Sequence, residues 1–149
     1  MSAIPRFGEY AAAFEKAVAS DDWSVVAPFF TEDATYEVFA MPPPIGGRWD
    51  GRDAVLACFK SVLDGFDRRF ATREVTLLEG PREEDAAVWI RGRADYSSPA
   101  VPDLSFELEE TATFSGARIC RLEDRYDDAT VTALKAYLER HGPKLGIEV

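Results

Sequence analysis

The spacing of the apolar residues changes near residue 68, and this change restricts the chain to one class of fold. Before that position apolar residues recur every three or four places, which predicts amphipathic helices over residues 6–19 and 51–66. Beyond it, apolar and polar residues alternate, which predicts strands. The alternating runs cover residues 70–78, 87–97, 104–114 and 119–126. With a last helical pattern over 128–141, we predict an α+β fold in which helices pack on one face of a curved antiparallel sheet.

Shorter elements lie between the two long helices. Asp22 is placed to cap a short helix that buries Trp23, and residues 34–39 are rich in β-forming side chains. The segment 41–47 contains three prolines and two glycines, which predicts a shaped loop rather than regular structure. Further turns are expected at Gly80-Pro81 and at residues 99–102.

The charge balance excludes several kinds of partner. Lys and Arg number 17 against 27 Asp and Glu, so the net charge of −10 would repel phosphate backbones and anionic lipid surfaces. We therefore expect neither nucleic acid nor a membrane as a partner. No apolar run approaches the ~20 residues that span a bilayer, and the start MSAIPRFGEY lacks the apolar stretch of a signal peptide. We expect a cytoplasmic protein with one domain over residues 1–149, a length that permits a real core.

The rare residues exclude several kinds of chemistry. With one histidine, His141, and two distant cysteines, Cys58 and Cys120, we expect no metal site and no disulfide framework. Cys58 falls on an apolar helix face, which predicts a buried thiol. The glycine-rich motifs of dinucleotide and phosphate binding are absent from the sequence, so we expect no cofactor. The remaining chemistry belongs to carboxylates, arginines, tyrosines and the shape of a pocket.

Two carboxyl groups interrupt the apolar face of the last two strands. Glu110 falls among apolar residues at the even positions of 104–114, and Asp124 does so in 119–126. A hairpin loop over residues 116–118 would place Glu110 opposite Asp124, about 5 Å apart at Cβ. Two carboxylates so close in an apolar site cannot both ionise easily, so we predict a coupled acid pair with one raised pKa. The alternatives are a slipped register, a bulge that separates the acids, or acids with a purely structural role.

The run that contains Arg93 permits two interpretations. Its apolar face carries Ala94 and Tyr96. Alternation then places Arg93 and Asp95 on the outer surface, within reach of glutamates on the next strand. The alternative turns Arg93 and Asp95 toward the pocket, which requires the face of Trp89 to point inward or a bulge to reverse it.

The order of elements resembles the nuclear transport factor 2-like superfamily. The matching segments are residues 21–23 (DDW), 30–36 (FTEDATY), 51–55 (GRDAV) and 118–127 (RICRLEDRYD). The resemblance covers most of residues 7–135 and implies a cone-shaped half-barrel of curved antiparallel sheet, with helices on its concave face and a deep pocket between them. Because sheets of this fold often pair, the resemblance also implies a homodimer.

Two branches of this superfamily imply different chemistry. In the limonene epoxide hydrolase branch, which the sequence resembles at Arg93-Ala-Asp95 and around Asp124, Asp124 would act as general base on water. Asp95 would then be the general acid on the epoxide oxygen, with Arg93 as the bridge that orients both. Tyr36 also matches that branch, whereas Val38 replaces an asparagine that helps to hold the water.

The SnoaL-like polyketide cyclase branch has an aspartate at the place of Asp124, which acts as acid and base on an enolisable substrate. Ketosteroid isomerase, a further relative, has an oxyanion-stabilising acid where Glu110 falls. Its catalytic tyrosine and aspartate would fall on Phe14 and Val38, so its own mechanism is not implied. Asp124 is the residue that the alternation and two branches support together.

These observations predict a cofactor-independent acid/base enzyme with a deep apolar pocket for a small hydrophobic molecule. The most specific versions are an epoxide hydrolase-like activity and a SnoaL-like cyclase or isomerase activity. The alternatives are a non-catalytic ligand-binding or dimerisation module, and a protein-interaction role that would need a large exposed apolar patch. The predicted catalytic residues are Asp124, Asp95, Arg93 and Glu110. The predicted substrate-binding residues are Phe14, Tyr36, Val38, Trp49, Phe59, Trp89, Leu122 and Tyr126.

Overall fold

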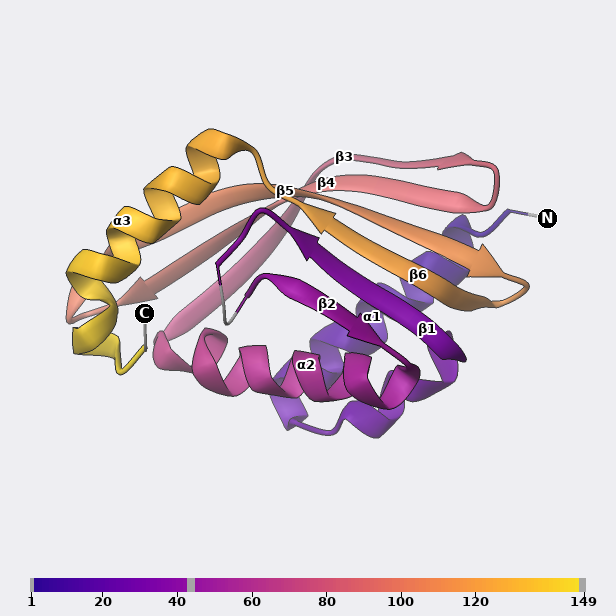
Figure 1. The fold of residues 1–149 in the computed structure, drawn as a ribbon, viewed down its shortest axis with the longest axis horizontal. Coiled ribbons are helices and arrows are strands. Elements are labelled where there is room, and N and C mark those ends of the chain that lie inside the picture. The colour runs from indigo at the N-terminus through magenta and orange to yellow at the C-terminus, as the bar shows by residue number, and fades with distance from the viewer. Residues whose placement is uncertain (1, 43–44, 148–149) are drawn as a thin grey trace.

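The computed structural model describes residues 2–42 and 45–147, and it confirms an α+β fold with a curved, unclosed sheet (Figure 1). The helices are α1 (Ile4–Ser20), α2 (Arg52–Gly65) and α3 (Asp128–Leu145), with short 3₁₀ helices η1 (Trp23–Val25), η2 (Ala27–Phe29) and η3 (Asp67–Arg69). The strands are β1 (Phe30–Phe39), β2 (Gly47–Asp50), β3 (Thr72–Glu84), β4 (Ala87–Ser98), β5 (Val101–Ser115) and β6 (Arg118–Arg125). They form one sheet in the order β2-β1-β6-β5-β4-β3.

The sheet and the helices form two layers. Helices α1 and α2 lie together on one side of the curved sheet, and α3 packs near one end of it, against β5 (Figure 1). Strands β3 to β6 form the antiparallel meander that the alternation predicts. Strand β1 differs, because it pairs with β6 in parallel. Parallel neighbours need a long crossover connection, and here α2 with the four strands β2 to β5 provides it.

The core lies between the two layers and is rich in aromatic rings. Phe59 of α2 contacts Phe14, Phe30 and Tyr36, with ring centroids between 5.2 and 5.9 Å apart. Aromatic pairs in such tilted arrangements contribute about 0.5–1.5 kcal/mol each beyond the burial of their surface. Phe59 therefore fixes α2 against both α1 and β1, and this contact sets the shape of the space between helices and sheet.

The predicted cap at Asp22 is confirmed. Its side chain accepts a hydrogen bond from the backbone N–H of Ser24 at 3.1 Å and begins η1. The expected short helix is split into η1 and η2, with Pro28 in the first turn of the second piece. Trp23 is buried as expected, and its indole N–H donates to Asp21 at 3.1 Å.

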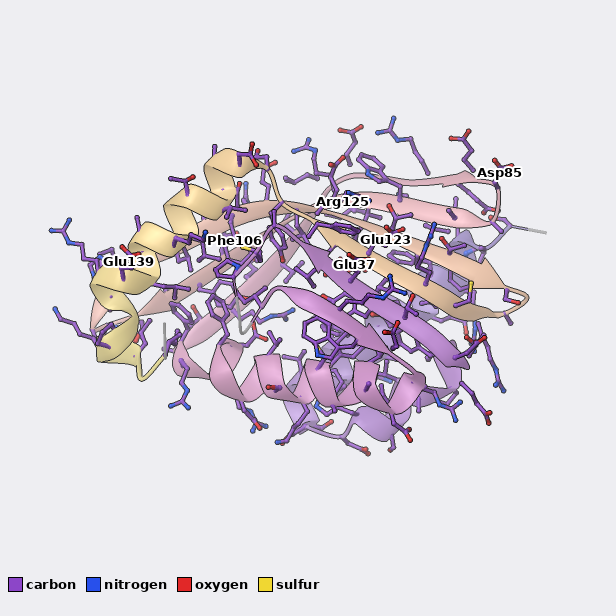
Figure 2. All side chains as sticks on the ribbon, in the orientation of Figure 1. Glu37, Asp85, Phe106, Glu123, Arg125 and Glu139 are labelled. Atoms are coloured by element: carbon purple, nitrogen blue, oxygen red, sulfur yellow. The ribbon has the colours of Figure 1, made fainter. Side chains whose placement is uncertain are left out.

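The predicted turn at Gly80-Pro81 is wrong, because β3 continues through it to Glu84. The chain turns instead at Asp85, which Figure 2 labels at the tip of the hairpin between β3 and β4. β3 is an edge strand, so the missing N–H of Pro81 removes no bond from the interior of the sheet. Register shifts on both sides of Glu79 absorb the irregularity.

Two further boundaries differ from those predicted. Strand β2 was not expected, because four residues are too few to show an alternating pattern. Part of the predicted loop over 41–47, residues 43–44, lies outside the described residues. Helix α3 continues past the predicted end at residue 141 to Leu145, and the left-handed Gly146 closes it, with its N–H directed to the carbonyls of Gly142 and Pro143.

Candidate active site

The hairpin of β5 and β6 brings the two predicted acids face to face. Glu110 of β5 pairs directly with Asp124 of β6, as predicted. The turn is shorter than expected, since it consists of Gly116 and Ala117 alone, with Gly116 at a φ of 62°. A bulge at Cys120 compensates for the shorter turn and restores the pairing. Without this bulge Asp124 would point to the opposite face of the sheet, because strand side chains alternate.

Asp124 is buried on the concave side, with 5% of its surface exposed. The hydroxyl of Tyr36 on β1 donates to its Oδ2 at 2.5 Å. Its Oδ1 is also buried and accepts no hydrogen bond from any described residue. Burial raises the pKa of Asp124, while its contacts with Glu110 and Tyr36 lower it. Tyr36 therefore fixes the orientation of the Asp124 carboxyl group, and the other oxygen is enclosed by protein atoms.

The pKa of Glu110 is also raised. Burial raises the pKa of Glu110 well above its ordinary value of 4.5, and the negative charge of Asp124 raises it further. Tyr36 stabilises the ionised form of Asp124 only. Two neighbouring acids of this kind favour a single shared proton, and the hydrogen bond from Tyr36 to Asp124 favours Glu110 as its holder.

This arrangement predicts a pH-dependent effect of Glu110→Gln on stability. The folded state binds the Glu110 proton more tightly than the unfolded state, so the free energy of unfolding of the wild type falls as pH rises above about 4.5. Glutamine does not titrate, so the variant lacks this loss. We expect the variant to gain stability over the wild type as pH rises, by up to about 1.4 kcal/mol per pH unit. Urea unfolding at several pH values measures the difference.

The matched control for this prediction is Glu107→Gln, on the opposite face of the same strand. Glu107 is exposed and forms an ion pair with Arg91. Its stability difference from the wild type should be nearly constant over the same pH range. If Glu110→Gln behaves like this control, then Glu110 is ionised in the folded protein and the assignment of the proton is incorrect.

The acid pair lies in the wall of an apolar cavity of about 220 Å³ between the sheet and helices α1 and α2. The predicted binding residues that line it are Phe14, Tyr36, Phe59 and Tyr126. Two others, Val38 and Leu122, are buried in the core and lie outside the described lining of the cavity. Trp49 of β2 stacks against the ring of Tyr36 at 5.6 Å and also lies outside that lining.

Arg93, Asp95 and Trp89 lie on the outer face of the sheet, which corrects their predicted place in the site. Arg93 Nε donates to Asp95 Oδ2 at 3.1 Å, and their side chains are 43% and 39% exposed. The indole of Trp89 donates to Glu109 at 3.2 Å. β4 has no register shift at these positions, so alternation decides the face, and Ala94 takes the inward place.

The outward position also determines the protonation of Asp95. The hydroxyl of Ser105 donates to Asp95 at 2.6 Å, and this bond, followed by that of Arg93, lowers the pKa of Asp95. A carboxyl group with a lowered pKa holds no proton near neutral pH and is a poor general acid. Of the predicted acids, the partly buried Glu110 lines the cavity and has a raised pKa, so it replaces Asp95 as the candidate proton donor.

Tyr10 of α1 was not predicted as a site residue, although it lines the cavity. It is 3% exposed, and its hydroxyl donates to no described residue. Burial raises the pKa of Tyr10 well above 10.0, and the neighbouring acid pair raises it further, so the hydroxyl stays neutral. In the sequence Tyr10 stands among phenylalanines on an apolar helix face, and this pattern indicates a core residue rather than a donor.

A second polar cluster lines the same cavity and was also missed. The hydroxyl of Tyr96 donates to Asp67 Oδ1 at 2.5 Å, and Arg73 Nε lies 3.6 Å from the same oxygen. Arg73 also forms a bidentate pair with Glu15 of α1, at 2.7 and 3.4 Å. These residues come from α1, η3, β3 and β4, so no local motif in the sequence connects them.

The predicted buried thiol at Cys58 is confirmed, with 3% exposure. Burial, followed by the charge of Asp124, raises the pKa of Cys58 to about 12. The thiol therefore stays protonated at neutral pH and is a poor nucleophile. The described residues contain no cluster of three histidine, cysteine or acidic side chains that could hold a metal ion. None of the described helices is long and apolar enough to cross a bilayer.

A curved sheet with helices on its concave side is the fold of nuclear transport factor 2-like proteins, and here the acid pair lines the cavity between the sheet and the helices. Residues 10–125 match the SnoaL-like domain, and the chain belongs to this family. The matched span includes both acids of the pair. No curated protein sequence matches the chain significantly.

Several solved structures share the fold. TerC, co-crystallised with polyporic acid, is 16% identical with a TM-score of 0.66, over 91% of this chain and 98% of its own. A putative isomerase from Rhodopseudomonas palustris is 14% identical with a TM-score of 0.67, over 91% and 97%. An LEH-like epoxide hydrolase from M. tuberculosis is 17% identical with a TM-score of 0.61, over 88% of both chains. At these identities the likeness concerns the fold alone.

Proposed function

We propose that this protein is a cofactor-independent enzyme that moves a proton on a small apolar molecule, at a carbon next to a carbonyl group. The observation that carries the proposal is the buried pair of Glu110 and Asp124 in the wall of an apolar cavity. The pair supplies a base and an acid side by side, and one proton is shared between them. Its environment separates the pKa values of the two acids, which is how enzymes assign two carboxyl groups to different roles.

Asp124 is the base in this proposal. Its carboxylate removes a proton from the carbon, and the electron pair of the broken C–H bond forms a C=C bond while negative charge develops on the carbonyl oxygen. The Tyr36 hydrogen bond fixes the orientation of the carboxylate. The apolar wall deprives the carboxylate of hydration, which strengthens it as a base.

Glu110 is the acid in this proposal. Its proton forms a hydrogen bond with the oxygen on which the charge develops, and a donor placed there stabilises the transition state. The neutral hydroxyl of Tyr10 faces the same cavity and can provide a second donor. Return of the proton from Asp124 to a different carbon of a conjugated enolate completes an isomerisation. Attack of the new carbon nucleophile on a second carbonyl, whose oxygen then takes the proton from Asp124, completes a cyclisation.

Deuterium exchange tests the proposal without knowledge of the natural substrate. The protein is incubated in D₂O with a panel of apolar cyclic and aryl ketones, and deuterium incorporation next to the carbonyl is followed by NMR. We expect exchange above the buffer rate for those members of the panel that bind. A protein that binds ketones from the panel and exchanges none of their protons would be a binding module, and the proposal would fail.

Epoxide hydrolysis is the second candidate, supported by the hydrogen bond from Tyr36 to Asp124 and by the fold shared with an epoxide hydrolase. Asp124 would activate water, and Glu110 would replace Asp95 as the acid on the epoxide oxygen. Val38 is apolar, so it offers the water no hydrogen bond. This difference places epoxide hydrolysis second.

Substitutions of Arg93 and Asp95 on the outer face test whether Asp95 or Glu110 is the general acid. We expect Arg93→Ala and Asp95→Ala to change turnover by no more than about twofold, because surface changes of this kind shift free energies by ~0.5 kcal/mol or less. The measurement is diol formation from an epoxide panel, or deuterium exchange from the ketone panel. If turnover falls more than tenfold in either variant while the melting temperature is unchanged, then Arg93 and Asp95 take part in the reaction.

A further inference from the structure

The apolar cavity borders an open groove between α1 and β3, and the two share part of their lining. The groove has a volume of about 590 Å³, and the residues it shares with the cavity include Phe7, Ala11, Val75 and Ile90. A cavity of 220 Å³ is smaller than the roughly 300–1,000 Å³ usual for ligand sites, whereas cavity and groove together fall within that range. A ligand of ordinary size that enters the cavity would therefore extend past the shared residues into the groove.

Two polar attachments hold α1 over β3 and leave the groove between them. At one end Glu83 accepts hydrogen bonds from the hydroxyl of Ser2 and the backbone N–H of Ala3, both at 2.8 Å. At the other end Arg73 pairs with Glu15 at 2.7 Å. Between these points the helix and the strand are not joined by a described side-chain hydrogen bond. These two attachments set the distance between α1 and β3. The helix is therefore held in place without side chains packed into the groove.

The floor of the groove exposes large apolar side chains to solvent. Val75 is 47% exposed and Leu77 is 54% exposed, and both lie on β3 in the lining of the groove. Among the described residues, Val25 is the one other large apolar residue with comparable exposure, at 39%. Exposed apolar surface that is gathered in one concave place indicates a binding surface.

Gly8 keeps the helix side of the groove open. It lies inside α1 and lines the groove, and a Cβ atom added there would meet no atom within 4 Å. Its backbone is helical, so the turn does not require glycine, and glycine in a helix interior is less stable than alanine. The sequence thus has the smallest residue where a side chain would fill the groove.

We propose that the groove between α1 and β3 binds the apolar tail of the substrate, whose oxygen-bearing head lies at Glu110 and Asp124. The substrate class is an elongated apolar molecule with a polar group at one end, such as a molecule with an alkyl or isoprenoid chain. This inference rests on the proposed function for the position of the head. The tail passes Phe7 and Ala11 at the junction of the two spaces and lies along Val75 and Leu77.

Binding of unreactive straight-chain primary alcohols tests the proposal. Each methylene that leaves water for an apolar site adds about 0.8 kcal/mol, or roughly a three- to fourfold decrease in Kd. We expect the Kd of the wild type to fall by this factor for each added carbon over a series of roughly six to twelve carbons. Fluorescence of Trp23, which lines the cavity, reports binding.

Gly8→Leu should fill the groove and leave the cavity open. We expect short alcohols to bind as in the wild type, while the gain in affinity stops after the cavity is full. Ala19→Leu is the matched control, because it places the same side chain at an exposed position of α1 that does not line the groove. Leucine favours helix more than glycine does, so the variant should fold. Leu77→Lys, at an exposed position, is the second variant. It should weaken the binding of long alcohols and leave that of short alcohols unchanged.

A wild type whose Kd does not change with chain length would overturn the proposal, as would a Gly8→Leu variant with the wild-type dependence. If the wild type shows no dependence and Gly8→Leu changes the sedimentation of the protein, the groove is instead an interface between two copies of the chain. The alcohols undergo no reaction, so this result is independent of deuterium exchange. Failure of exchange with a retained chain-length dependence rejects the proposed function only.

Discussion

Replacing Asp124 with asparagine is expected to slow deuterium exchange into a bound ketone by about 10²- to 10⁴-fold, the usual contribution of a positioned general base. Asparagine has nearly the same shape and still accepts the hydrogen bond from Tyr36, so the cavity should keep its form. It cannot take up the proton. Because the change removes a step and not a contact, the Kd of the ketone should remain within a few-fold of the wild type.

Glu123→Gln is the matched control for Asp124→Asn, since it makes the same acid-to-amide change one residue earlier. Glu123 and Arg125 flank Asp124 in β6 and form an ion pair on the other face of the strand, and both are labelled in Figure 2. We expect this control to exchange at nearly the wild-type rate. If Asp124→Asn exchanges as fast as Glu123→Gln, another group is the base and the proposed mechanism is incorrect.

Replacing Glu110 with leucine is expected to lower the exchange rate by about 10²- to 10³-fold, the usual cost of a lost donor to a developing oxyanion. Glutamine at the same position keeps an N–H donor but has no proton to give. The loss in Glu110→Gln should therefore be smaller than that in Glu110→Leu. This order distinguishes a hydrogen-bond donor from a base. If Glu110 were the base, the exchange rate would fall equally in both variants.

The Glu110 variants also separate catalysis from stability. A buried acid pair costs free energy that an apolar side chain of similar size does not, so Glu110→Leu should be at least as stable as the wild type above neutral pH. An inactive variant with a raised melting temperature would fit the account. An inactive variant that has lost its fold would not test the role of Glu110, and Glu110→Gln, with its smaller change in shape, then decides the question.

The sequence predicted the acid pair because strand alternation is a strong constraint. Glu110 and Asp124 each interrupt an apolar face, and only one family of registers places both faces on the core. The predicted loop was one residue too long, yet the pairing was correct, because the bulge at Cys120 adds back that residue. The apolar face of β6 decided the register, and the turn adapted to it.

The parts that sequence could not predict depend on contacts between distant elements. Arg93 and Asp95 match a short catalytic motif, but a motif does not state which face of a strand it occupies, and the alternation around Ala94 correctly favoured the outer one. The cluster of Asp67 and Arg73 depends on how α1 crosses β3, which no local pattern contains. The groove, likewise, depends on the spacing between a helix and an edge strand.

The proposed mechanism requires that Glu110 and Asp124 together hold one proton at neutral pH. Carbon NMR of protein labelled at the side-chain carboxyl groups, titrated from about pH 4 to pH 9, measures this directly. The account predicts one glutamate signal that still has the shift of a protonated carboxyl group near pH 7 and is lost in Glu110→Gln. A titration in which every glutamate ionises below about pH 5 would contradict it.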